Sequence, residues 1–290
     1  MPADGHADVA IAALEAGKHV LVEKPLCLAL DDADRLDRAA EQSAGVAMVA
    51  FNLRWHRLAR KAREVVRSGV LGKIDAVRTV WSSSFDHRSE VGTWRSERRS
   101  GGGVLLELGP HHFDLVRFLL EDEFVEVAAS TRSGPWEDEA AVVTARTEGG
   151  VLASAVLSQR SVNENEVEIF GAAGRLRLSF YRYDGLEVVA SPGFPAGVGN
   201  RLRRAAWAAT TLPVAVIGAS RGGDYAATYR AEWRHFLDAV REGRASECTL
   251  EDGRRNLELL LAAADSAERR VAVRVADAPR TIPALQEGPS

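Results

Sequence analysis

A lysine that follows an apolar strand is the first residue of this sequence with the chemistry of a catalyst. Lys24 comes directly after the apolar run HVLV (residues 19–22) and Glu23. Only four of the 37 basic residues are lysines, so a lysine here suggests a need for a compact ammonium with a tunable pKa, which arginine does not supply. Ligands of open α/β sheets bind outside the carboxyl ends of strands, where Lys24 is expected. The alternative is a solvated lysine in an exposed Lys-Pro turn.

A histidine in a glycine-rich segment is the second candidate for proton transfer. Within SGGGVLLELGPHHFD (residues 100–114), Pro110 suits the first position of a helix. His111 then lies in the first turn, where the helix dipole lowers the imidazole pKa and favours the neutral form that a general base requires. Glu107 could orient the ring or share its proton, while Asp114 could complement the helix end. A capped helix with a packed histidine explains the same pattern and stays open.

Several common cofactor and metal motifs do not occur in the sequence. No GxGxxG is present, because Leu202 stands where Gly197 and Gly199 would need a third glycine. The GGG at 101–103 lacks the strand–loop–helix context of a phosphate loop, and P-loop, HExxH and GxSxG motifs are absent. We predict no metal site, because the other histidines considered lack metal-ligand spacing: His6, His19, His56 and His87.

Composition and charge limit the class of protein. A chain of 290 residues exceeds the size at which one core usually suffices, which predicts two lobes. The formal charge of −4 argues against a nucleic-acid partner. Cys27 and Cys248 cannot make a disulfide scaffold and fit a reducing cytoplasm. No secretory signal is visible, and the apolar stretch 205–219, interrupted by Pro213, is too short to span a bilayer, so we expect a buried or interface segment and no membrane partner.

The hydrophobic pattern predicts an α/β fold in two parts. A partial, Rossmann-like parallel sheet accounts for the first part, residues 1–52, where helical spacing alternates with apolar runs: 7–16, 19–22, 31–43 and 46–52. The second part, residues 53–290, carries successive short β-patterned runs, which indicate a large, mainly antiparallel open sheet. We further expect helices at 57–72, 110–121, 229–243 and 250–270, a long loop or insertion at 191–224, and a frayed tail after about residue 275.

Together these segments resemble the Gfo/Idh/MocA oxidoreductase family, related to glucose–fructose oxidoreductase and inositol dehydrogenase, over roughly residues 2–275. ALEAGKHVLVEKP resembles the first signature of that family, and GGGVLLELGPHHFD resembles the second, GGGxLxDxGxHxxD. The resemblance implies NAD or NADP as the cofactor and a sugar, cyclitol or related polyol or ketone as the substrate. It also implies a homo-oligomer formed through the open sheet.

The same resemblance implies roles for individual residues. Lys24 would hydrogen-bond the reacting hydroxyl, and His111 would take its proton as hydride leaves the carbon. An ammonium beside the reacting oxygen would stabilise a developing alkoxide. Further residues would line the cofactor or substrate site: Pro2, His6, Glu23 and Pro25, together with Asn52, Arg54, Trp94 and Arg95.

Two features depart from the family pattern. Glu107 stands in place of the family aspartate, and one extra methylene moves the carboxylate by about 1 Å, a shift that can be costly in catalysis. The first strands, the Gly-rich phosphate turn and the acidic ribose-binding residue of the family, roughly 70 residues, have no counterpart before PADGH. The resemblance therefore implies an N-terminally truncated member whose cofactor binding is compromised.

Three hypotheses for the function follow. The first is an NAD(P)-dependent oxidoreductase with a shortened start. The second is a non-catalytic homologue or truncated form that acts as a binding or assembly subunit, which the missing fingerprint and Glu107 favour. The third is a relative that uses bound NAD for glycoside hydrolysis or elimination, because the same lysine and histidine could serve that chemistry.

Overall fold

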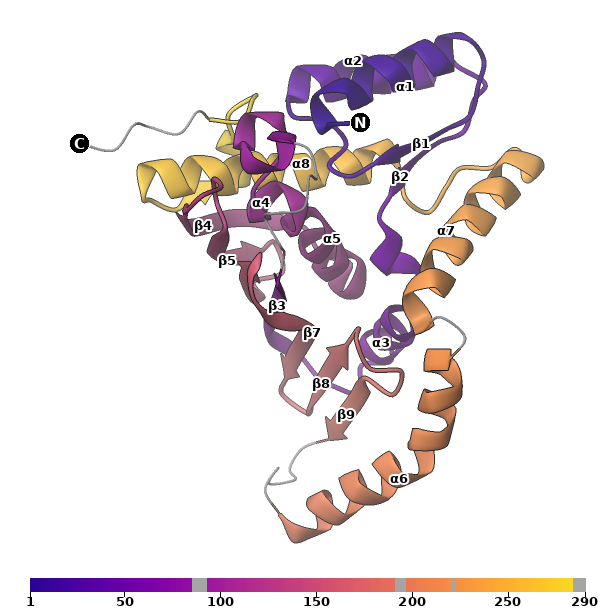
Figure 1. The fold of residues 1–290 in the computed structure, drawn as a ribbon, viewed down its shortest axis with the longest axis vertical. Coiled ribbons are helices and arrows are strands. Elements are labelled where there is room, and N and C mark those ends of the chain that lie inside the picture. Colours follow the sequence, from indigo (N-terminus) through magenta and orange to yellow (C-terminus); the bar gives the residue numbers. More distant parts are fainter. Residues whose placement is uncertain (85–92, 191–196, 221–222, 284–290) are drawn as a thin grey trace.

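The N-terminal part of the chain alternates helices with parallel strands. The computed structural model describes residues 1–84, 93–190, 197–220 and 223–283, so His87 lies outside the described residues. The first elements are α1 (His6–Glu15), β1 (Val20–Glu23), α2 (Leu30–Glu41) and β2 (Ala47–Ala50) (Figure 1). β1 and β2 pair in parallel, with Val20 opposite Ala47. The parallel arrangement predicted from the two apolar runs is confirmed.

A large mixed sheet dominates the second part. Its strand order is β10-β4-β5-β6-β3-β7-β8-β9. Neighbouring strands run antiparallel except β3 and β6, which run parallel, so the predicted mainly antiparallel sheet is confirmed. The strands are β3 (Ile74–Ser84), β4 (Phe124–Arg132), β5 (Ala140–Thr147), β6 (Leu152–Ser158), β7 (Arg160–Gly171), β8 (Gly174–Ser179), β9 (Leu186–Ala190) and β10 (Val273–Arg274).

The two faces of this sheet differ in burial because side chains alternate along each strand. In β5, Ala141 and Val143 are buried, whereas Val142 between them is 53% exposed. Val142 lies opposite Val156 of β6, which is also exposed. One face thus forms a core against helices, and the other presents apolar side chains within the described part of the chain.

Helices cover the buried face and connect it to the N-terminal part. They are α3 (Arg57–Arg67), α4 (Val104–Glu107), α5 (Gly109–Leu120), α7 (Gly223–Glu242) and α8 (Leu250–Arg269). In α8, Leu259 and Leu260 belong to the core of the large sheet, while Leu257 and Leu261 belong to the core around β1 and β2. Because α8 packs in both cores, the two parts of the chain share this helix. The domain boundary after residue 52 therefore stays a prediction.

The predicted loop over 191–224 is wrong for most of its length. Residues 198–220 form α6 (Val198–Ser220), with Pro213 inside the helix. Alanine and arginine are strong helix formers and outweigh the one donor that proline removes. Leu212 and Val216 are exposed, so residues 205–219 are not buried throughout. The other alternative, an interface segment, stays a prediction. Residues 191–196 and 221–222 lie outside the described residues.

The tail beyond residue 275 is not frayed as predicted, up to residue 283. Arg280 pairs with Asp31 and Asp34 of α2, each at 2.5 Å. The backbone N–H of Leu30 donates to the carbonyl of Arg280 at 2.7 Å, and Ala29 bridges Thr281. These partners lie about 250 positions away along the chain, so no local pattern could indicate them. Residues 284–290 lie outside the description.

The described residues contain neither a helix that could span a membrane nor a cluster of metal ligands. None of their helices combines the length and the apolar character needed to cross a membrane. No group of three or more histidine, cysteine or acidic side chains among them is arranged to hold a metal ion. Cys27 and Cys248 are both free thiols in the interior.

Candidate active site

The Lys24 side chain links the end of β1 to the segment before α5. β1 ends at Glu23, and the Lys24 ammonium donates a hydrogen bond to the backbone carbonyl of Glu107 at 2.7 Å. Glu107 is the last residue of α4, so this bond joins two segments 83 positions apart in the sequence. An ammonium has three N–H donors, and two of them remain for other partners. The solvated Lys-Pro turn does not describe this lysine.

The surroundings of Lys24 make its proton easier to lose. Burial lowers the pKa of the ammonium from its usual value, and the positive charge of Arg95 adds to this effect. The carboxylates of Glu107 and Glu23 act in the opposite direction but do not cancel it. A lysine with a lowered pKa next to charged neighbours is a common feature of functional sites.

His111 lies in the first turn of α5, one residue after Pro110, as its sequence position predicts. The Trp81 ring of β3 lies against it, with ring centroids 4.9 Å apart. The pKa of His111 lies well below the usual histidine value because the ring is buried and because Lys24 and His112 lie nearby. Burial is therefore the main cause, where the sequence suggested the helix dipole. Among the described residues, no hydrogen-bond partner reaches its Nδ1.

The Glu107 carboxylate does not orient His111, contrary to the expectation from its spacing. Its Oε2 accepts a hydrogen bond from Gln159 at 2.5 Å, and its Oε1 lies 3.3 Å from the Arg95 guanidinium. The carboxylate points to these partners because α4 ends at Glu107 and α5 starts a new helical segment at Gly109. Glu107 contributes to the site through its backbone carbonyl, which holds Lys24.

Three site residues were missed by the sequence analysis. They are Trp81, which also lies 5.3 Å from the His112 ring, Gln159, which holds Glu107, and Asn165, which pairs with His112 at 3.0 Å. All come from the large sheet or its connections and are buried. The one available signal was a polar residue at a strand position predicted to face the core. Buried polar groups need partners, so such a residue indicates a polar contact there.

The N-terminal turn lies against the Lys24 segment. The His6 ring hydrogen-bonds the carbonyl of Pro25 through Nδ1 at 3.0 Å, which requires the proton on that nitrogen. Pro2 precedes the short helical turn Ala3–Gly5, and Pro25 is buried. Glu23 is exposed, and its carboxylate accepts a bond from the Lys24 backbone N–H at 3.3 Å. The His6–Pro25 hydrogen bond therefore brings the N-terminal turn to the segment after β1. That Pro2, His6, Glu23 and Pro25 line a cofactor site stays a prediction.

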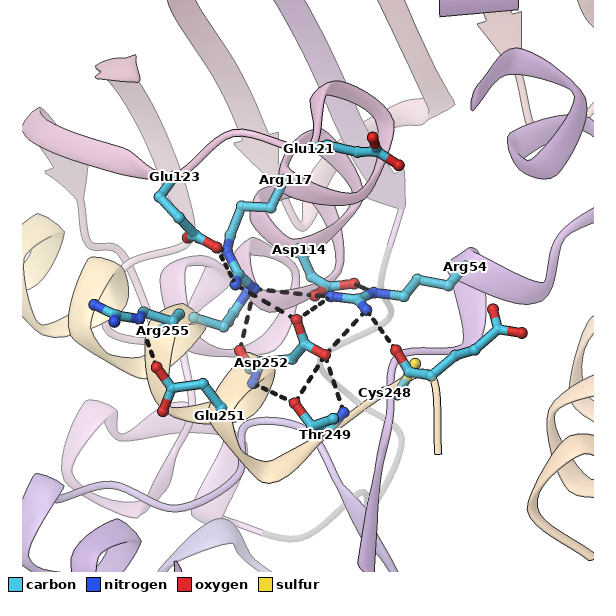
Figure 2. A network of polar contacts seen from close by, with 12 residues as sticks. Arg54, Asp114, Arg117, Glu121, Glu123, Cys248, Thr249, Glu251, Asp252 and Arg255 are labelled. Atoms are coloured by element: carbon cyan, nitrogen blue, oxygen red, sulfur yellow. Dashed lines mark hydrogen bonds and ion pairs between the residues drawn. The ribbon is translucent and has the colours of Figure 1, made fainter. Parts of the chain in front are cut away.

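Arg54 lies in a buried ion network (Figure 2). It follows β2 in the turn Asn52–Trp55, and its guanidinium donates to both oxygens of Asp114 at 2.7 and 2.5 Å. It also donates to Asp252 of α8 at 2.9 Å, and Arg117 joins the same carboxylates. Arg54 is 6% exposed. Arg54 thus links β2, α5 and α8, and Asp114 is part of that link. Contact of Arg54 with cofactor or substrate stays a prediction.

The remaining predicted residues are Asn52 and Trp94. Asn52 is buried after β2, and neither side-chain polar atom makes a hydrogen bond among the described residues, although the Tyr225 hydroxyl of α7 lies close. Glu232, also on α7, has its pKa raised to about 8 by burial and by Glu23. Trp94 belongs to the turn Thr93–Ser96, but its side chain lies outside the description.

These unpartnered atoms suit the reactive end of a nicotinamide cofactor with its substrate. The Asn52 amide, His111 Nδ1 and Glu232 Oε1 are buried and without hydrogen bonds in the described part of the chain. Buried polar groups usually have partners, so such a cluster beyond the carboxyl ends of β1 and β2 indicates a ligand site. No GxGxxG motif occurs among the 290 residues.

Comparisons with known proteins agree with this geometry. Residues 1–51 match the family model described as an oxidoreductase family with an NAD-binding Rossmann fold. Residues 59–177 match the GFO/IDH/MocA C-terminal domain. The fold and the two matches thus define a two-part α/β protein whose first part is similar to an NAD-binding Rossmann fold. The chain belongs to the Gfo/Idh/MocA family.

Curated relatives match over part of their length. The myo-inositol 2-dehydrogenase of Thermotoga maritima is 31% identical over 180 residues, which cover 59% of this chain and 52% of that protein. The levoglucosan dehydrogenase of Pseudarthrobacter phenanthrenivorans is 26% identical, covering 86% and 71%. The chain thus spans about half the length of the first of these relatives.

Solved structures share the fold. An oxidoreductase domain protein from Kribbella flavida superposes with a TM-score of 0.77 at 24% identity, covering 94% of this chain and 79% of its own. A levoglucosan dehydrogenase solved with NADH gives a TM-score of 0.76 at 24% identity, covering 95% and 78%. At this identity the likeness concerns the fold.

Proposed function

We propose that the chain is an NAD(P)-dependent oxidoreductase that transfers hydride between a nicotinamide cofactor and a sugar, cyclitol or related polyol or ketone. The observation that carries the proposal is the partly buried Lys24, hydrogen-bonded at the end of β1 beside a neutral His111. The family membership and the sugar and cyclitol dehydrogenases among the relatives support the same activity.

The two side chains divide the acid–base work. The nicotinamide ring, when bound, would supply the hydride acceptor. Lys24 keeps two N–H donors free to hold the substrate hydroxyl and to stabilise negative charge on its oxygen. His111 stays neutral at pH 7 and offers a lone pair for the hydroxyl proton. Trp81 limits the movement of the imidazole ring and excludes water from one side of it.

Positioning falls to the residues around this pair. The Glu107 carbonyl fixes the Lys24 ammonium, and Gln159 and Arg95 fix Glu107 in turn. Asn52 and Glu23, at the ends of β2 and β1, would hold the reactive end of the cofactor. Misplacement by about 1 Å can cost a hundredfold in rate, so this support is part of the proposed site.

Turnover by the 290-residue chain tests the proposal. Reduction of NAD or NADP would be followed by absorbance with myo-inositol, scyllo-inositol and levoglucosan as candidate substrates. We expect substrate-dependent reduction, and we expect Lys24→Met and His111→Gln to lower kcat by about 10²- to 10⁴-fold. Lys18→Met, at an exposed lysine outside the site, is the matched control.

Two results would contradict the proposal. Substrate conversion without net NADH change would point to elimination or glycoside hydrolysis. Absence of NADH binding in a fluorescence titration, together with absence of turnover, would favour the binding-subunit alternative.

A further inference from the structure

A pocket between the turn after β8 and the helices α6 and α7 has no role in the proposed function. Its volume is about 350 Å³, within the range of small-molecule sites. The turn between β8 and β9 forms one wall with Phe180, Tyr181 and Tyr183, and Val216 of α6 forms part of another. Three aromatic side chains in one wall provide flat apolar faces of the kind that pack against ligand rings.

Two carboxylates give this pocket hydrogen-bond acceptors. Asp184 accepts from Thr211 at 3.2 Å, and Asp224 at the start of α7 accepts from Arg57 at 2.8 Å. A carboxylate has about four lone-pair positions, so both can accept further bonds from hydroxyl groups. Aromatic faces combined with carboxylate acceptors suit a polyhydroxylated ring.

The charges of the pocket favour a neutral ligand. Arg57 pairs with Asp224, and Arg182 pairs with Asp184 at 3.4 Å. Each positive charge is therefore balanced by a negative one. A phosphate or carboxylate ligand would have to displace an aspartate from its arginine, which disfavours anions.

A buried histidine lies next to two of the lining residues. His56 is fully buried, and its Nδ1 accepts from the backbone N–H of Leu58 at 3.2 Å. The neutral ring therefore carries its proton on Nε2. That nitrogen lies 4.0 Å from Asp224, beyond hydrogen-bond range, and makes no hydrogen bond among the described residues. The His56 ring also packs edge-on against Phe180, with ring centroids 4.8 Å apart.

Side chains connect this pocket to the proposed catalytic pair. Tyr181 interacts with Trp81, whose ring lies 4.9 Å from His111. Tyr225, next to Asp224, lies close to both Tyr181 and Asn52. Tyr181, which lines the pocket, is thus linked through Trp81 to His111.

We propose that this pocket is a subsite for a second ring of the substrate, so that the chain acts on a neutral glycoside or disaccharide. The inference rests on the proposed function, because the first ring is the one held by Lys24 and His111. The second ring would pack on Tyr181 and Tyr183 and donate hydroxyl hydrogen bonds to Asp184 and Asp224.

Equilibrium binding tests this subsite without relying on turnover. The 290-residue chain would be titrated calorimetrically with glucose and with two glucose disaccharides, cellobiose and maltose. We expect at least one disaccharide to bind about tenfold more tightly than glucose. Val216→Trp fills the pocket from a position that is 60% exposed and should remove that gain. Leu202→Trp, on the same helix and also exposed, is the matched control and should keep it.

Lys24→Met separates the failure of this inference from failure of the proposed function. We expect it to weaken glucose and disaccharide binding alike. If Lys24→Met weakens glucose binding but no disaccharide binds more tightly, or Val216→Trp has no effect, the subsite is wrong and the proposed function stands. Disaccharide binding that depends on Val216 but not on Lys24 would also reject the subsite, since the pocket would act independently. Absence of sugar binding throughout would overturn both.

Discussion

Burial lowers the pKa of both Lys24 and His111, but nearby carboxylates oppose the shift only at Lys24. His111 carries a pKa well below that of an ordinary histidine because of burial first and the positive charge of Lys24 second. Lowering the pKa of a base favours its neutral form, so His111 can accept a proton at any pH above that low value. The same burial lowers the pKa of Lys24, yet Glu107 and Glu23 help to retain its proton.

Removing the Lys24 charge should therefore raise the pKa of His111. In the unmodified chain we expect the ring to titrate below pH 6.5. Lys24→Met eliminates one cause of the shift, so the midpoint should move upward and stay below 6.5, since burial remains. Histidine C–H proton NMR over pH 3 to 8 measures both midpoints independently of turnover.

Lys18→Met provides the control, because Lys18 is exposed. A His111 midpoint that does not respond to Lys24→Met would mean that the two groups are not electrically coupled.

At the scale of elements, Arg54 fastens β2 to α5 and α8. Its two partners, Asp114 and Asp252, lie 60 and 198 positions away in the sequence. The three charges are buried together, so the loss of one leaves the others without compensation. Arg54 thereby holds in place the helix α5 that carries His111.

Arg54→Met should destabilise the chain by about 3–5 kcal/mol, the usual cost of breaking a buried ion pair. Urea unfolding followed by circular dichroism measures the difference in free energy. Arg35→Met is matched to it, since Arg35 pairs with Asp8 at the surface and its loss should change the free energy of unfolding far less. Equal effects of the two substitutions would show that the network does not stabilise the fold.

For the whole molecule, the exposed face of the large sheet is the surface that could bind a second copy of the chain. Val142, Leu152 and Val156 expose apolar side chains on it, and isolated proteins seldom leave such patches uncovered. We propose, as the family resemblance implied, that a second copy of the chain covers this face.

Val156→Lys should dissociate such an assembly, because it places a charge in an apolar interface. Light scattering after size exclusion would show a fall in mass, with the thermal unfolding of the chain otherwise retained. Val9→Lys, at an exposed position of α1, should leave the mass unchanged. A chain that is monomeric before substitution would refute the proposal.

The sequence predicted the elements whose signals are local. β1 and β2 were visible as apolar runs because strands buried on both faces need apolar side chains throughout. Lys24 and His111 were visible because each stands at the boundary of an element. α6 was missed because Pro213 interrupts the apolar stretch, while helix propensity over many residues prevailed.

What the sequence by itself determined was the family, the α/β class and the two residues proposed for proton transfer. Tertiary structure alone decided the partners of those residues: the Glu107 carbonyl for Lys24, Trp81 for His111, and Asp114 with Asp252 for Arg54. The pocket beside Tyr181 and the fixed tail at Arg280 likewise became apparent only in the folded chain. The physical reason is distance along the chain, because patterns record what each residue prefers locally, whereas burial and pairing depend on segments brought together by folding.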